Sequence, residues 1–150
     1  MKSCPSVRRR SAGFTLIEVM VATSISGVLA SVAYPSFSGV LQKVRRSEAL
    51  VAAMQIQQAQ ERWRAGSSRY GTLAEVGVGS VAPGRNYLLS VTSPSATGYV
   101  ALAQATGLQA GDRACRYMKL SVDGGNTVYS SGETEAATNN AQGNRQCWNL

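Results

Sequence analysis

The chain has 150 residues, enough for one domain with a buried core, and 44% of them are hydrophobic. It contains no histidine, so the commonest general base, zinc ligand and triad member is missing, and we expect no enzyme, cofactor or metal site. The net charge is +7, but four cations lie within the first ten residues, and the remaining +3 makes a nucleic-acid partner unlikely on charge alone.

An uncharged stretch dominates the N-terminal third. No charged residue occurs from Val19 to Gln42, a run of 24 positions, and a helix needs only about 20 residues to cross the hydrocarbon core of a bilayer. Three arginines at positions 8–10 precede it and hold this end in the cytoplasm by the positive-inside rule. Glu18 places a carboxylate within the apolar segment, where a charge is costly and therefore indicates a function.

The sequence Gly-Phe-Thr-Leu-Ile-Glu at positions 13–18 follows a short basic leader and precedes a long apolar helix. This arrangement resembles the processing site of type IV pilins. The resemblance is close from residue 13 to about residue 34 and looser beyond, where the family pattern continues as a helix, a sheet and two cysteines. The arginine-rich leader and the pair Cys147-Trp148 look most like the PilE-type minor pilins.

The resemblance implies a role for each matched residue. A prepilin peptidase would cut between Gly13 and Phe14, and the same enzyme would then N-methylate Phe14. Glu18 matches the glutamate that pairs with the N-terminal amine of a neighbouring subunit during assembly. Gly27 and Pro35 match two helix-weakening positions, between which pilin helices melt in assembled fibres. One departure is a polar cluster inside the apolar stretch, which weakens the membrane anchor somewhat: Thr23, Ser24 and Ser26.

Other export signals fit the N-terminus less well. The small residues at 31–33 could form a signal-peptidase site before Tyr34, and the arginines at 9–10 resemble a twin-arginine signal. A glutamate is unusual in such an apolar run, however, and the run continues past that site. A lipoprotein anchor needs a cysteine after the apolar run, whereas Cys4 precedes it.

The helical pattern continues to about Arg64. Beyond Gln42 it becomes amphipathic, because apolar residues recur at spacings of three and four. The sequence Gly-Ser-Ser at 66–68 then ends the helix. The apolar face consists of Ala49, Ala52, Ile56, Ala59 and Trp63. We expect this face to pack against a sheet.

Four strand patterns follow a Gly- and Ser-rich connection that spans residues 66–85. The third pattern alternates well, and the sequence Asp-Gly-Gly-Asn at 123–126 predicts a hairpin turn after it. The expected strands are 87–92, 99–103, 116–122 and 127–129. The fold class is therefore α+β: a long N-terminal helix, transmembrane in its first half and amphipathic in its second, packs on an antiparallel sheet.

Three cysteines are present, but Cys4 would leave with the leader. The mature chain keeps Cys115 and Cys147, and an even pair in an exported protein predicts one disulfide. Residues 130–146 are polar and rich in turn residues. We expect a poorly ordered loop there unless the disulfide holds it.

Other polar residues have weaker claims to function. Glu133 and Glu135 lack the repeating Asp/Asn pattern of a calcium loop, so a solvated loop is the simpler interpretation. Scattered arginines could form a DNA-binding stripe, but without interleaved aromatic residues they usually form only a solvated face. The four arginines concerned are Arg62, Arg64, Arg69 and Arg85.

The sequence therefore predicts a structural subunit of a type IV pilus, most simply a minor pilin, with a leader at 1–13, a transmembrane and filament-core helix at 14–42 and a globular domain at 43–150. It would cross the inner membrane once before assembly and reach the cell surface in a filament afterwards.

The family implies four partners: other pilin subunits, the prepilin peptidase and methyltransferase, an inner-membrane platform and an assembly ATPase. Motility, adhesion and DNA uptake are not separated by the sequence. The alternatives are a pseudopilin of a type II secretion system, against which the paired cysteines argue mildly, and a membrane-tethered binding module.

Overall fold

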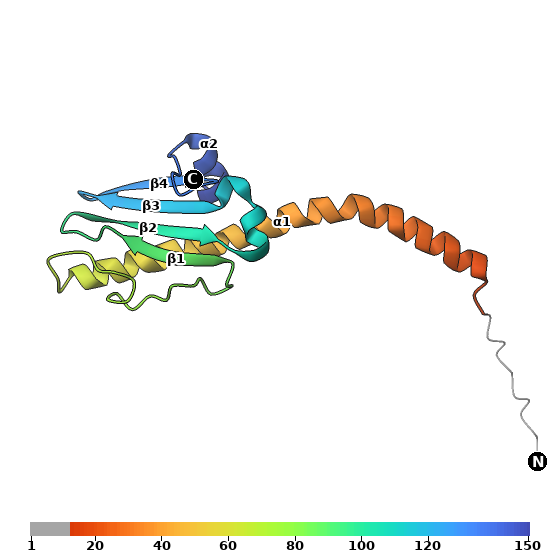
Figure 1. The fold of residues 1–150 in the computed structure, drawn as a ribbon, viewed down its shortest axis with the longest axis horizontal. Helices are drawn as coiled ribbons and strands as arrows, with labels where there is room; N and C mark the ends of the chain where they lie inside the picture. The colour runs from red at the N-terminus through yellow and green to blue at the C-terminus, as the bar shows by residue number, and fades with distance from the viewer. Residues whose placement is uncertain (1–12) are drawn as a thin grey trace, which may run out of the picture. The chain divides into compact units, whose positions relative to one another are not determined.

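Figure 1 shows the fold in a computed structural model that describes residues 13–150, apart from the side chains of residues 35 and 36. The leader arginines and Cys4 lie outside the described residues. Two compact units make up the chain, Met1–Ser38 and Gly39–Leu150.

The first unit holds the start of helix α1, which spans Leu16–Arg64. Every side chain from position 13 to position 34 is exposed, although most are apolar. By length and composition α1 could cross a membrane. The helix assignment runs through Gly27 and Pro35 without a break.

Two hydroxyl groups of the polar cluster bond to the backbone of their own helix. The Thr23 hydroxyl donates to the Val19 carbonyl over 2.9 Å, and the Ser24 hydroxyl donates to the Met20 carbonyl over 2.8 Å. These bonds satisfy the hydroxyls without a partner from outside the helix. Thr23 and Ser24 therefore cost the apolar stretch less in a bilayer than unpaired hydroxyls would.

The second unit is a four-stranded sheet with the remainder of α1 against one face (Figure 1). The strand order is β1-β2-β3-β4, and every neighbouring pair is antiparallel. The strands are β1 (Tyr87–Thr92), β2 (Gly98–Ala105), β3 (Tyr117–Asp123) and β4 (Asn126–Gly132). Two short 3₁₀ helices, η1 (Gly107–Gly111) and η2 (Arg113–Cys115), connect β2 to β3. A helical turn α2 (Ala141–Gly143) and a π-helical turn η3 (Asn144–Trp148) follow β4.

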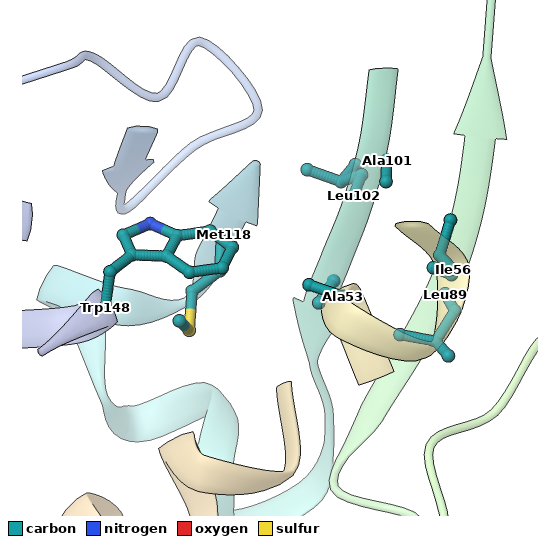
Figure 2. Close-up of a pocket in the computed structure, with 8 residues that line it drawn as sticks. Ala53, Ile56, Leu89, Ala101, Leu102, Met118 and Trp148 are labelled. Atoms are coloured by element: carbon teal, nitrogen blue, oxygen red, sulfur yellow. The ribbon is translucent and has the colours of Figure 1, made fainter. Parts of the chain in front are cut away.

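The core lies between α1 and the facing side of the sheet. The helix contributes mainly small residues, so it can lie close to the strands, and the sheet contributes larger ones. The buried helix residues are Ala49, Ala52, Ala53, Ile56 and Ala59, and the buried sheet residues include Tyr87, Leu89, Tyr99, Met118 and Leu120. A cavity of about 10 Å³ with an almost entirely apolar lining remains in this core. Figure 2 shows Ala53, Met118 and Trp148 among the residues that line it. Such a cavity stays dry.

The expected α+β architecture is confirmed, as are the four strands and the apolar face of the helix, although Trp63 at the end of that face is only half-buried. The disulfide on which the order of segment 130–146 was expected to depend is present, but the segment also has secondary structure that was not predicted. β4 extends through Gly132, Ser131 pairs with Thr138 in an isolated bridge, and residues 141–148 are helical.

Candidate functional site

The start of α1 is organised by Thr15 and Glu18. The backbone N–H of Thr15 donates to Glu18 Oε2 over 2.8 Å, and the Thr15 hydroxyl donates to the same oxygen over 2.7 Å. In return, the Glu18 N–H donates to Thr15 Oγ1 over 3.3 Å. This is a capping box, which satisfies backbone donors at a helix start. Sequence analysis missed Thr15, although its spacing from Glu18 is the signature of this motif.

The carboxylate of Glu18 has capacity beyond this cap. It is exposed, as is Phe14, whose side chain is 87% exposed four residues before it. An ionised carboxylate offers about four acceptor positions, so the two bonds from Thr15 leave room for a further donor. Gly13 has free space around it as well, because a Cβ added there would meet nothing within 4 Å.

The C-terminal segment is tied down at several points. Cys115 and Cys147 are joined by a disulfide, with their Cα atoms 5.5 Å apart. Trp148 is 1% exposed, and its indole N–H donates to the Ser130 carbonyl over 3.0 Å. Its ring also meets Tyr129 edge to face at 5.0 Å. The contacts of Trp148 with Tyr129 and Ser130 of β4 therefore hold the C-terminal segment in addition to the disulfide.

A buried polar cluster connects this segment to α1. Arg46 binds Asp112 in a bidentate manner, with Nε–Oδ2 and Nη2–Oδ1 distances of 2.6 and 2.8 Å. Its remaining Nη1 donates to the Gln146 carbonyl over 2.9 Å. Gln109 is fully buried beside this pair and donates to Asp112 Oδ2 over 3.1 Å. Because these residues lie 66 positions apart along the chain, no local sequence pattern could reveal them.

Three arginines gather at the C-terminal end of α1. Arg62 is exposed, and the Arg64 guanidinium lies 5.0 Å from the centre of the Tyr70 ring. Arg69 forms an ion pair with Glu75 at 2.5 Å. Hydrogen bonds from Arg69 and then from Thr72 lower the pKa of Glu75 to about 2, so the carboxylate stays charged and partly neutralises Arg69.

Arg85 lies at the opposite end of the sheet from these three. Arg85 lies just before β1, and its carbonyl accepts from the hydroxyl of Thr106, which follows β2, whereas the Tyr70 N–H donates to the Ser95 carbonyl beyond the end of β1. Arg62, Arg64 and Arg69 therefore lie at one end of the globular unit, and Arg85 lies at the other. The four-arginine stripe considered from the sequence does not form.

Glu133 and Glu135, the remaining acidic candidates, do not form a binding site. Glu133 forms long ion pairs with Arg113 and Arg116, at 3.6 and 3.9 Å, and Glu135 is exposed. Within residues 13–150, no group of three or more acidic, cysteine or histidine residues is arranged to hold a metal ion.

Two family profiles match adjoining parts of the chain. Residues 8–34 match the prokaryotic N-terminal methylation motif, and residues 35–119 match the profile described as type IV minor pilin ComP, DNA uptake sequence receptor. The second match covers more than half of the chain. The chain belongs to this minor pilin family. The methylation motif and the apolar helix that follows fit a pilin that is anchored in the inner membrane and then assembled into a surface filament.

Proteins of type II secretion systems and a type IV pilin resemble this chain. Type II secretion system core protein G of Aeromonas hydrophila is 35% identical over 65 residues, which are 43% of this chain and 46% of that protein. The core protein G of Dickeya chrysanthemi is 35% identical over 75 residues, 50% of this chain and 48% of that protein. Type IV major pilin protein PilA of Myxococcus xanthus is 36% identical over 69 residues, 45% of this chain and 31% of that protein. The matched part thus spans about half the length of the secretion proteins and a third of PilA.

Proposed function

We propose that this pilin is a minor, non-enzymatic subunit of a type IV pilus, made as a prepilin and cut between Gly13 and Phe14. The match to a minor pilin profile directly after a methylation motif carries this proposal. The leader would end at 13, residues 14–42 would form the membrane and filament-core helix, and residues 43–150 would face outward. The peptidase, the methyltransferase, an inner-membrane platform and an assembly ATPase would be its partners.

Assembly would use the charge of Glu18. Cleavage before Phe14 creates an amine, and its positive charge complements a carboxylate that would otherwise be costly in an apolar environment. In a filament the amine of one subunit would bind the Glu18 carboxylate of its neighbour, which has acceptor positions to spare. Gly27 and Pro35 would be the positions at which the helix loosens during this step.

The N-terminus of the assembled protein tests the proposal. Mass spectrometry of sheared surface filaments should detect this chain at low stoichiometry, beginning with N-methylated Phe14. Gly13→Leu should retain the leader and remain in the membrane, and the free space around Gly13 means that this variant should still fold. A mature N-terminus at Tyr34 would instead indicate ordinary signal cleavage and contradict the proposal.

The pseudopilin alternative is favoured by the similarity to two core G proteins of type II secretion systems. Stoichiometry and location separate the two functions. Recovery of this chain only from envelope fractions, together with loss of protein secretion in a deletion strain, would support a pseudopilus. Recovery from long sheared filaments with secretion intact supports the pilus.

We infer that binding of DNA is a second function, because the matching profile is described as a DNA uptake sequence receptor. At the end of α1, Arg62 and Arg64 are the candidates to contact phosphates, since neither forms an ion pair among the described residues. Arg69 contributes less because Glu75 binds it. Motility and adhesion have no comparable support from a specific observation.

The salt dependence of binding tests this second function. Arg62→Gln with Arg64→Gln should weaken the binding of duplex DNA and reduce the slope of log affinity against log salt by about two, because each lost phosphate contact removes about 0.9. Arg85→Gln is the matched control, since this exposed arginine lies at the other end of the sheet. An unchanged slope in the double variant would exclude the α1 end as the DNA surface.

A further inference from the structure

A rigid loop lies beside the turn of α1 at which the uncharged stretch ends. Gln109, in η1, donates from Nε2 to the carbonyl of Gln42 over 3.3 Å and to the Tyr87 hydroxyl over 3.1 Å. Gln109 is 0% exposed, whereas the preceding Leu108 is 82% exposed. Figure 1 shows this segment between β2 and β3, next to α1. The buried glutamine thus fixes a loop that holds a large apolar side chain out in the open.

The length of the uncharged stretch sets the depth at which this loop would lie. Residues 16–42 form 27 helical positions, which span about 40 Å at 1.5 Å per residue. A bilayer is about 40–45 Å thick when its headgroup layers are included. If the stretch crosses the membrane, as the proposed function requires, Gln42 lies at the outer edge of the headgroups. The bond from Gln109 to Gln42 then places Leu108 at the same level.

Charge is distributed unevenly over the two ends of the globular unit. We call the part that carries η1, η2 and the C-terminal segment the η1 end. Besides the mutually bound Arg46 and Asp112, its carboxylates are Glu48, Glu133 and Glu135. Its cations are Lys43, Arg45, Arg85, Arg113, Arg116 and Arg145.

The opposite end is balanced. Arg62, Arg64 and Arg69 are matched there by Glu61, Glu75 and Asp123. Lys119 lies in the middle of β3, and the rest of the unit's positive excess therefore lies at the η1 end, which also carries the exposed Leu108. An exposed apolar side chain on a surface with an excess of cations is a pattern by which proteins bind the interface of an anionic bilayer.

We propose that the η1 end is a second membrane contact of the unassembled pilin, in which Leu108 enters the outer headgroup layer and the cations of the same end bind anionic lipid headgroups. The apolar helix alone would leave the globular unit free to rotate and tilt at the surface. The contact restricts that motion and presents one fixed face to incoming subunits. On extraction into a filament, Leu108 leaves the lipid.

Fluorescence quenching in vesicles tests this contact. The full chain with Cys4→Ser and Leu108→Cys is labelled with an environment-sensitive dye and inserted into phosphatidylcholine vesicles with or without phosphatidylglycerol. The dye at position 108 should be blue-shifted and quenched by lipids that carry a nitroxide near the headgroup, more strongly with phosphatidylglycerol. Val128→Cys is the matched control, because Val128 is 40% exposed on β4. A dye there should respond only to an aqueous quencher.

Two controls keep the outcomes distinct. Resistance to alkaline extraction reports that the helix is inserted, so a loss of insertion would contradict the membrane anchor itself. Insertion with equal aqueous quenching at positions 108 and 128 would overturn the second contact while leaving the anchor in place. Protection of position 108 in lipid-free filaments but not in vesicles would assign Leu108 to a subunit interface and also overturn the proposal.

Discussion

Glu18 can serve the helix start, the contact between subunits, or both, and the roles differ in whether they need a charge. Glutamine completes a capping box as glutamate does, but it offers no charge to an amine. We therefore expect Glu18→Gln to be inserted and processed normally yet to enter filaments poorly, as Glu18→Ala should. The measurement is the ratio of sheared to membrane-held protein, determined by quantitative immunoblotting.

Thr15→Val is the matched control for this experiment. It removes the hydroxyl that bonds Glu18 but keeps the carboxylate. Loss of a cap costs about 1 kcal/mol of helix stability, a small cost for a helix of 49 residues. Normal incorporation of Glu18→Gln together with a defect in Thr15→Val would show that Glu18 acts only as a cap.

The Arg46–Asp112 pair should matter most among single polar contacts of the globular unit. The side chains are only 11% and 4% exposed, so removal of Arg46 leaves a buried carboxylate without its counter-charge. Breaking such a pair costs about 3–5 kcal/mol. We expect Arg46→Ala to lower the free energy of unfolding by that amount in urea denaturation. Arg45→Ala, at the neighbouring half-buried arginine, should cost under about 1 kcal/mol.

The elements of the fold could be predicted where the sequence pattern is local and periodic. Apolar spacing identified the buried face of α1, and the turn at 123–126 gave the β3–β4 hairpin, whose register pairs Asp123 with Asn126. The hydrophobic pattern did not predict the structure of residues 130–146, because polar residues and their hydrogen bonds hold that segment in place. Ser130 and Ser131 are 5% and 4% exposed, and the Asn140 side chain accepts from the Gly143 N–H over 2.6 Å.

The candidate site divides along the same line. Gly13, Phe14 and Glu18 are contiguous and could be recognised from a motif, whereas the cluster of Arg46, Gln109 and Asp112 depends on contacts between distant elements. The four arginines of the predicted stripe show both cases. Arg62 and Arg64 are close in sequence and lie at the same helix end. The position of Arg85 depends on the direction of β1, which composition does not encode.

At the scale of the whole molecule, the two units are stabilised by different interactions. The apolar stretch before residue 35 buries none of its side chains within the chain and depends on lipid or on other subunits, whereas the globular unit has its own core and a disulfide. A lesion in the globular unit should therefore leave membrane insertion intact. This independence makes the disulfide a useful test, because its two possible effects can be read separately.

We expect Cys147→Ser to remain in the membrane and to be processed at Gly13, while its globular unit loses stability. The bond closes a loop with a sequence separation of 32, worth about 3–4 kcal/mol in the chain-entropy estimate. Because Trp148 and the Arg46 bond to Gln146 still hold the segment, fraying should be confined to about 133–146. Limited proteolysis with mass mapping should place new cuts there in Cys147→Ser and extend them into β4 when Trp148→Ala is added. Cuts spread throughout the globular unit in Cys147→Ser alone would contradict this, and would show that the disulfide supports the whole sheet rather than the C-terminal segment.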